Sequence, residues 1–263
     1  MLSTVVSLVS GCAPVRCTEP SGLAGWPGEL ADLTMRWSAE PGISVTGRAA
    51  VVARAYVESY VLASAMRDDR YLYPGFDHAV DHNTGNGGIS ATEALWPDTE
   101  QVKYGPIVGT YHNRILTVDK SGSDLTMVVC TYLYATATLA HSGWVTNWRA
   151  ISDSDAHAGI YPLKISMTVP ERSQLSLPPQ EGWARTPSED VFGDWRVTGF
   201  FWSFMGAGWF PREWPDYDQT LDTCAERAPD PLERRREIDN LTDPKRSDFP
   251  TLPAYPGWPE VRP

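Results

Sequence analysis

Apolar residues recur every three to four positions between residues 47 and 66, and this period predicts a long amphipathic helix. The positions of the stripe are Ala50, Val51, Ala53, Tyr56, Val57, Tyr60, Val61 and Ser64. Arg48, Arg54 and Glu58 fall outside it. Thr46 precedes the helix and is suited to cap its N-terminus. We therefore expect one face of the helix to lie on an apolar surface.

Beyond residue 105 the period shortens to two, which predicts β-strands. Residues 106–118 and 125–137 are rich in β-branched and aromatic side chains, and the polar stretch 119–124 between them fits a hairpin connection. Further strands are expected at 161–169 and 194–204, where aromatic residues are dense. A helix followed by a run of long antiparallel strands places the chain in the α+β class.

The last part of the chain has a different pattern. Residues 221–227 and 231–238 suggest two short helices. Residues 249–259 contain a proline at every third position from 250 to 259, so this stretch is expected to be extended. We expect it to lie across the domain as a strap, anchored by Tyr255 and Trp258.

At the other end, an apolar run at residues 2–9 is followed directly by Ser10, Gly11 and Cys12. The run is too short to span a bilayer. It resembles the signal segment of bacterial lipoproteins, which is cut before a cysteine that is then acylated. The resemblance implies a lipid on Cys12 and an anchored protein on the extracytoplasmic face of the cell membrane. The alternative is that residues 2–9 form a buried strand.

The signal segment is short and carries no Lys or Arg before its apolar run, which favours a translation start further upstream. We divide the chain into four parts. Residues 1–11 are the signal segment, and residues 12–44 are the acylated cysteine with a flexible tether rich in Pro, Gly and Ser. Residues 45–205 form the α+β domain, and residues 206–263 form the helical and extended C-terminal strap.

Composition supports one exported globular domain with flexible ends. The chain has 263 residues, of which 42% are hydrophobic and 11 are Trp, enough for one sizeable core. Its formal net charge is −11, which disfavours a nucleic acid as partner because phosphates would be repelled. No other apolar run approaches the length of a spanning helix, so membrane attachment would depend on the lipid.

The cysteines fit the same compartment. If Cys12 is acylated, then Cys17, Cys130 and Cys224 remain. We expect a Cys130–Cys224 disulfide, since Cys17 lies close to the anchor in the tether. The alternative is that Cys130, inside an apolar run, is a small buried hydrophobe.

A long helix, an aromatic loop at residues 71–76 and a run of long strands form an order that resembles the nuclear-transport-factor-like cone fold. In particular the chain is similar to exported cone-fold proteins of actinobacteria. This family includes ketosteroid isomerases and polyketide cyclases. The resemblance covers about residues 45–205 and implies a curved sheet around one helix. Between them the family has a conical pocket that holds an apolar ligand, a catalytic site or nothing.

The family resemblance raises an enzymatic alternative of the isomerase or cyclase type. Such chemistry needs a carboxylate base and a hydrogen-bond donor for the developing enolate. Asp69 with Tyr56 or Tyr60 is the candidate set. The competing interpretation is that both tyrosines are wall residues of the core and that Asp69 is a solvated helix end.

A metal site is a second alternative. His78 and His82 are four residues apart, and on a helix two such imidazoles can share a Zn²⁺ ion. Asp81 between them makes the stretch similar to the inverted zincin pattern. No third ligand stands out, and the Gly- and Asn-rich stretch 83–88 follows at once. Two solvated histidines are the plainer interpretation, and we expect no cofactor.

The sequence favours a binding module over an enzyme. Tryptophans gather in the last third of the chain, and the stretch from Phe200 to Trp202 is too apolar to be left in water. These side chains either fill the core or present an aromatic surface to a ligand or partner. We therefore expect a non-enzymatic domain of the cell envelope that serves as a scaffold or binds an envelope protein or an apolar small molecule.

Overall fold

The computed structural model describes residues 26, 28–83, 91–92, 94–100, 105–146, 156–171, 177–202 and 213–260. Its helices are α1 (Arg48–Met66), α2 (Phe76–Ala79), α4 (Tyr217–Glu226) and α5 (Leu232–Asp239), with short 3₁₀ turns η1 (Gly28–Leu30), η2 (Asp69–Tyr71) and η4 (Arg246–Asp248). Its strands are β1 (Leu33–Ala39), β2 (Ile107–Ser121), β3 (Asp124–Tyr132), β4 (Thr136–Ala140), β5 (Gly143–Thr146), β6 (Ile160–Thr168) and β7 (Arg196–Trp202).

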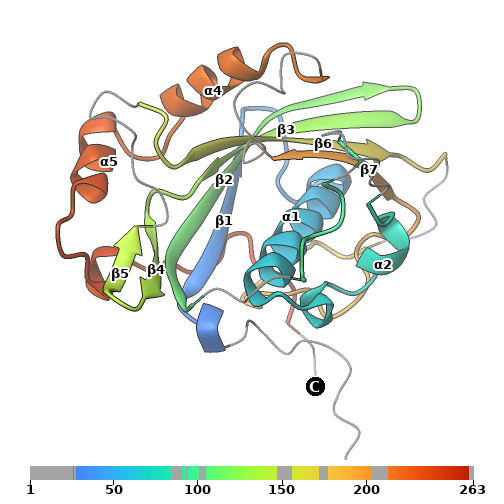
Figure 1. Cartoon of the computed structure of the whole chain (residues 1–263). Helices are drawn as coiled ribbons and strands as arrows, with labels where there is room; N and C mark the ends of the chain where they lie inside the picture. The colour runs from blue at the N-terminus through green and yellow to red at the C-terminus, as the bar shows by residue number, and fades with distance from the viewer. Residues whose placement is uncertain are drawn as a thin grey trace, which may run out of the picture.

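The strands form one curled, largely antiparallel sheet, so the molecule belongs to the α+β class (Figure 1). The strand order is β5-β4-β2-β3-β6-β7, and β1 pairs in parallel with β2 beside this path. The hairpin of β2 and β3 turns at Gly122, whose φ of 63° suits a residue without a side chain. Helix α1 lies on the concave side of the sheet, while α4 and α5 lie on the other side (Figure 1).

The two faces of the sheet carry separate clusters of side chains because residues alternate along each strand. On β3, Met127 and Val129 belong to the large core that includes α1. Their neighbour Cys130 belongs to a smaller core on the convex face, together with Cys224 of α4. The sheet is therefore covered on both faces, by α1 on one and by α4 and α5 on the other.

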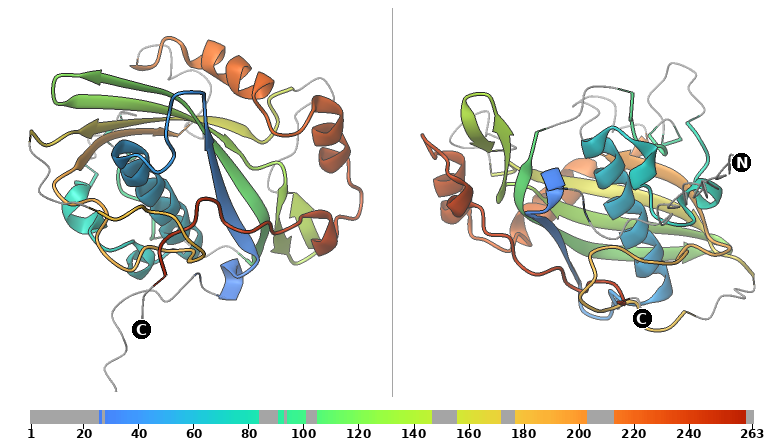
Figure 2. Two further views of the ribbon diagram at one scale, coloured as in Figure 1. Left: turned by 180° about the vertical axis from the view of Figure 1, so that it is seen from behind. Right: turned by 90° about the horizontal axis from the view of Figure 1, so that it is seen from below.

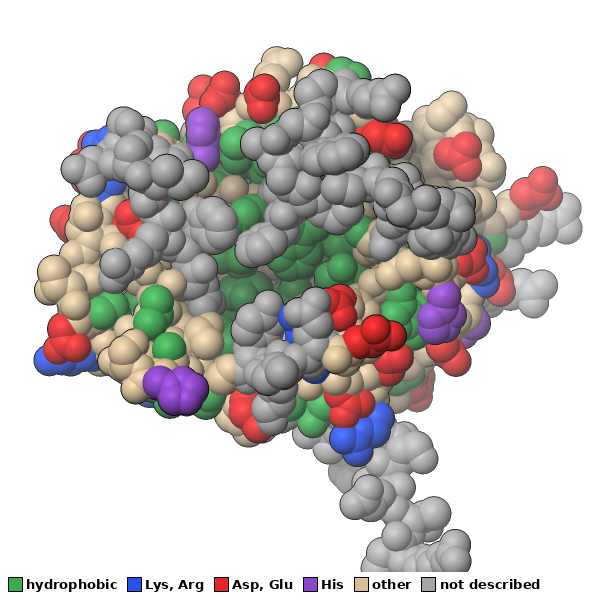
Figure 3. Space-filling view, viewed as in Figure 1, with side chains coloured by type: hydrophobic (Ala, Val, Ile, Leu, Met, Phe, Trp, Pro, Cys, Tyr) green, Lys and Arg blue, Asp and Glu red, His purple; other side chains and the backbone are tan. Residues whose placement is uncertain are grey.

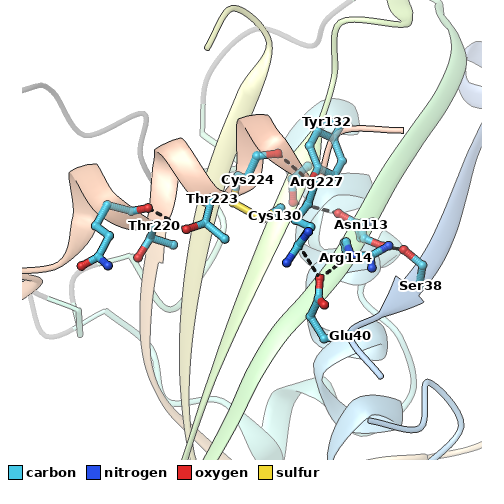
Figure 4. The surroundings of a disulfide bond; sticks show 12 residues. Ser38, Glu40, Asn113, Arg114, Cys130, Tyr132, Thr220, Thr223, Cys224 and Arg227 are labelled. Atoms are coloured by element: carbon cyan, nitrogen blue, oxygen red, sulfur yellow. Dashed lines mark hydrogen bonds and ion pairs between the residues drawn. A yellow bond between two sulfur atoms is a disulfide. The ribbon is translucent and has the colours of Figure 1, made fainter. Parts of the chain in front are cut away.

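The expected disulfide between Cys130 and Cys224 is confirmed, and it joins β3 to α4 across the convex face (Figure 4). The Tyr132 hydroxyl donates a hydrogen bond to the Cys224 carbonyl at 3.0 Å. Near the same junction, Glu40 Oε1 accepts from Arg114 Nε at 2.9 Å and lies 3.2 Å from Arg227 Nε. These contacts hold α4 against the sheet.

Two of the predicted boundaries were wrong. Residues 33–39 were expected to belong to the tether at 12–44, but they form β1, whose Leu33, Met35 and Trp37 are buried. A seven-residue strand next to a Pro- and Gly-rich stretch gives too short a pattern to recognise. The single strand expected at 125–137 is interrupted after Tyr132 by a turn, and β4 then begins a separate hairpin with β5.

The C-terminal segment runs beside β1, which pairs with β2 off the main strand order of the sheet (Figure 2). The Trp37 amide donates to the Tyr255 carbonyl at 2.5 Å, and the Tyr255 amide donates to the Met35 carbonyl at 3.3 Å. Further on, Trp258 forms an isolated antiparallel bridge with Ala184. Backbone groups at the free edge of β1 thus form hydrogen bonds with residues more than two hundred positions away in the sequence. The C-terminal segment therefore covers an edge strand that would otherwise present unpaired N–H and C=O groups.

Candidate functional site

Helix α1 and strand β7 place a cluster of aromatic rings between them. The Tyr56 ring stacks on Phe76 with centroids 5.6 Å apart, and it meets Phe200 edge-on at 5.0 Å. The Tyr60 ring lies 5.0 Å from Phe200 and 5.9 Å from Trp202. Tyr56 and Tyr60 are one turn apart on α1, and Phe200 and Trp202 share one face of β7 because they are two residues apart.

Tyr56 is a core residue. Its side chain is fully buried, and its hydroxyl donates a hydrogen bond to the Leu95 carbonyl at 2.8 Å. Burial raises the pKa of the Tyr56 hydroxyl well above its ordinary value. A hydroxyl so engaged and so far from water holds the loop around Leu95 in place.

Tyr60 and Trp202 are the half-buried members of the cluster. Burial raises the pKa of Tyr60 to about 12. The Trp202 indole Nε1 is buried and finds no hydrogen-bond acceptor among the described residues. The face shown in Figure 3 is hollowed between the sheet and α1, and hydrophobic side chains form the floor of the hollow. Tyr60 and Trp202 are therefore the members of the aromatic cluster whose side chains are in part accessible, while the Trp202 indole nitrogen itself is buried.

Asp69 is not brought together with these tyrosines. It is an exposed residue of η2, and its Oδ1 accepts hydrogen bonds from Trp96 Nε1 at 3.3 Å and Thr99 Oγ1 at 2.9 Å. The acid and base suggested by the sequence therefore face different partners. Asp69 instead anchors the segment at 96–99 to the end of α1.

The histidine pair is also separated. Helix α2 ends at Ala79, and Val80 is extended, so His78 and His82 do not lie one turn apart on a helix face. His78 Nε2 lies 3.2 Å from the Gly193 carbonyl and 3.5 Å from Asp190 Oδ2. The His82 ring stacks on Trp96 with centroids 3.8 Å apart. In the described part of the chain no three His, Cys, Asp or Glu side chains gather in a way that could hold a metal ion.

The feature that sequence reasoning missed is a buried charged cluster on α1. Arg54 and Glu58, assigned to the polar side of the helix, are 0% and 3% exposed. Glu58 Oε1 accepts from Trp37 Nε1 at 2.8 Å, and Glu58 Oε2 accepts from Trp258 Nε1 at 2.7 Å and from the Tyr73 hydroxyl at 3.2 Å. The carboxylate thus accepts hydrogen bonds from three separate segments of the chain.

Arg54 likewise forms hydrogen bonds with backbone carbonyl groups from several segments of the chain. Its guanidinium donates to the carbonyls of Val45 (3.3 Å), Gln180 (3.0 Å), Pro256 (2.7 Å) and Gly257 (3.0 Å). It also lies 4.4 Å above the Trp258 ring, a cation–π contact. Arg54 therefore ties α1 to the loop at 177–191 and to the C-terminal segment at the same point.

The cluster is closed rather than open to substrate. Desolvation raises the pKa of Glu58, although Arg54 and the three hydrogen bonds oppose the shift. A buried carboxyl of this kind is often catalytic. The cavity beside Glu58 has a volume of only about 10 Å³, however, which is near the minimum for one water molecule. The cluster fixes the surrounding segments to α1, and a sequence signal for it would have been the Arg-x-x-x-Glu spacing on an otherwise apolar helix.

The expected lipidation site Cys12 and the remaining Cys17 lie outside the described residues. Within the part of the chain that the structure describes, no helix is long and apolar enough to cross a membrane.

Comparison with known proteins gives no match: no family model, no curated protein and no solved structure is similar to this chain. The site must therefore be interpreted from its own residues.

Proposed function

We propose that this protein is a cell-envelope lipoprotein whose domain binds an apolar small molecule at the mouth of the concave face. The observation that carries the proposal is the pair Tyr60 and Trp202. Both rings belong to a large aromatic cluster but stay half-buried, and Trp202 Nε1 is buried without an acceptor among the described residues. Ligand pockets combine apolar walls with a few such polar groups.

The chemistry of the described residues favours binding over catalysis. Tyr56 is held by the Leu95 carbonyl and Asp69 by Trp96 and Thr99, so neither is placed to move a proton at the mouth. Glu58, the one buried carboxylate among the residues that the structure describes, faces a cavity too small for a substrate. The ligand we propose is flat and apolar, so that it can stack on the accessible parts of the Tyr60 and Trp202 rings.

The curled sheet with α1 on its concave side supports the cone-type fold as the proposed architecture. In such a fold the helix closes one side of the cone and the free end of the sheet leaves a mouth. Tyr60 near the end of α1 and Trp202 at the end of β7 are placed suitably for such a mouth.

Export is supported by the disulfide. Disulfides persist in oxidising compartments and are rare in the cytosol of most organisms, so Cys130–Cys224 is consistent with a domain that folds outside the cytoplasm. The lipid on Cys12 would then hold the domain at the membrane.

Ligand binding can be tested with the neutral fluorescent probe N-phenyl-1-naphthylamine. We expect saturable binding at one site per chain, with energy transfer from tryptophan. Trp202→Ala should weaken binding about tenfold, and Trp202→Phe should weaken it less because the apolar ring remains. Tyr255→Ala, which removes an exposed ring elsewhere, serves as the control and should bind like the original protein. Equal affinity in all four proteins, or no saturable binding, would overturn the proposal.

Lipid attachment can be tested by intact mass spectrometry of the protein produced in an actinobacterial host from a gene whose upstream region has been restored. The chain should carry a diacylglyceryl mass, and the mass should be lost in Cys12→Ala but kept in Cys17→Ala. An unprocessed and unmodified chain would contradict the proposed anchor while leaving the ligand-binding test unaffected.

A further inference from the structure

A second concave surface lies on the loop at residues 177–191, away from the Tyr60–Trp202 pair. It is a groove of about 790 Å³ between this loop and the last described residues, Pro259 and Glu260. Four prolines contribute flat apolar walls: Pro178, Pro179, Pro187 and Pro259. The volume falls in the range of known ligand sites, whereas the cavity at Glu58 is far below it.

Trp183 is the most exposed large hydrophobic side chain of this groove. It is 80% exposed, more than any other large hydrophobic residue that the structure describes. Its backbone is nevertheless fixed on both sides. The Ala184 amide donates to the Trp258 carbonyl at 3.1 Å, and the Trp258 amide returns a hydrogen bond to Ala184 at 2.8 Å. Just before it, a Cβ on Gly182 would lie 2.4 Å from the Trp258 carbonyl oxygen, so this backbone approach requires glycine.

The buried cluster on α1 supports the same loop from below. Arg54 donates to the Gln180 carbonyl on one wall of the groove and to the Gly257 carbonyl at the base of the other. The two walls are distant in the sequence and are bonded to one guanidinium. Trp183 is therefore presented to solvent by a rigid support, and its exposure is not the result of a loosely held loop.

The charged side chains that line the groove are all acidic, although the buried Arg54 below the loop interacts electrostatically with Glu181. Three carboxylates line it, from Glu181, Glu189 and Glu260, and its described lining contains no Lys or Arg. None of the three is in a salt bridge with a described residue. An aromatic face beside carboxylates is the arrangement that attracts ammonium and guanidinium groups.

We propose that this groove binds an extended peptide segment of a partner protein that carries Lys or Arg side chains. One cation would lie over the Trp183 ring, and others would meet the carboxylates, while the proline walls contact the peptide backbone. A peptide with more than one cation fits better than a single small amine, because Arg54 acts on Glu181 alone and one further positive charge would leave one of the other two carboxylates unneutralised. This proposal is independent of the apolar ligand at the Tyr60–Trp202 mouth.

The test is fluorescence anisotropy with a labelled peptide of alternating Pro and Arg residues, using the full chain. We expect binding that weakens as salt is raised toward physiological strength. Trp183→Ala should weaken it about tenfold, and the triple variant Glu181→Gln, Glu189→Gln, Glu260→Gln should weaken it and flatten the salt dependence. All four sites are on the surface, so these variants should fold like the original, which circular dichroism can verify.

Tyr255→Ala is the matched control, because Tyr255 is 55% exposed, is aromatic and lies outside the groove lining. It should leave peptide affinity unchanged. The proposal is overturned if the arginine peptide does not bind, if Trp183→Ala binds it equally well, or if the same peptide with Glu in place of Arg binds as tightly. Binding of tetramethylammonium as tight as that of the peptide would likewise overturn the peptide assignment.

Discussion

The indole of Trp258 donates a hydrogen bond to Glu58 Oε2 at 2.7 Å, so the end of the chain is bonded to the middle of α1. Both side chains are buried, and the Arg54 guanidinium lies over the same indole. The C-terminal segment is thus an integral part of the core. Its removal would expose one face of α1 as well as the edge of β1.

Trp258→Phe tests this bond with little change in shape. The phenyl ring keeps most of the packing but cannot donate to Glu58, so the free energy of unfolding should fall by about 1–3 kcal/mol. Urea denaturation followed by circular dichroism measures the change. Tyr255→Phe, three residues earlier and exposed, should change it by less than about 0.5 kcal/mol. Similar values for the two variants would show that the Trp258 hydrogen bond contributes nothing.

Stability should depend on the protonation of Glu58. Burial raises the pKa of this carboxyl above its ordinary value of 4.5, so the folded state holds the proton more tightly than the unfolded state does. The contribution of Glu58 to stability is then complete below that ordinary value and is lost as pH rises through the raised pKa.

Glu58→Gln removes this titration, so the stability of the original protein relative to the variant should decline as the pH rises above 4.5, the ordinary pKa of the carboxyl. Melting temperatures of both proteins from acidic to neutral and mildly alkaline pH give the measurement. The other carboxyls titrate in both proteins, so their effects cancel in the difference. A difference that stays constant with pH would rule out a raised Glu58 pKa.

The Cys130–Cys224 bridge closes a loop with a sequence separation of 94. In the chain-entropy model a loop of this length contributes about 4–5 kcal/mol, so reduction should lower the melting temperature markedly. The double variant Cys130→Ala, Cys224→Ala should melt near the reduced protein and should not respond to reductant. A melting temperature that reductant leaves unchanged in the original protein would contradict the expected contribution.

The close approach of the Asp190 carboxylate to the backbone of residue 75 requires a glycine at that position. The φ of Gly75 is 89°, and a Cβ there would lie 2.1 Å from Asp190 Oδ1, a carboxylate that accepts hydrogen bonds from the amides of Phe192 and Gly193. Gly75→Ala should therefore destabilise the protein by about 2 kcal/mol or more. Gly122→Ala has a similar backbone conformation with φ 63° but no atom within 4 Å, so it should cost less.

A thermal denaturation series measures both glycine variants, and the Asp190→Ala background separates the two causes. There the contacts with Asp190 Oδ1 and Cγ are gone and only the Cβ of residue 190, at 3.1 Å, remains close, so the added cost of Gly75→Ala should fall toward that of Gly122→Ala. An unchanged cost in this background would assign the whole effect to the backbone.

The periodicity of the sequence predicted the positions of helices and strands better than it predicted which side chains are buried. The three-to-four period gave a helix at 47–66, and α1 spans Arg48–Met66, while the period of two located the β2–β3 hairpin. The same period misassigned Arg54 and Glu58, because their partners lie up to two hundred residues away in the sequence. Burial of a charged side chain depends on what packs against it, which local periodicity does not contain.

The candidate sites show the same limit. Tyr60 and Trp202 were named from sequence and lie 5.9 Å apart between ring centroids. Asp69 and His78 were named from residue type and spacing. In the structure Asp69 accepts a hydrogen bond from Thr99, and His78 lies against the Gly193 carbonyl. Trp183 was noticed only as one tryptophan among several, since its exposure follows from the pairing of Ala184 with Trp258.

The bonding of α1 to Pro256, Gly257 and Trp258 also determines when the fold can be completed. A nascent chain that has reached only residue 250 holds Arg54 and Glu58 without the partners that make their burial tolerable. We therefore expect the core around α1 to close only after residues 256–258 have been made and have reached Arg54 and Glu58.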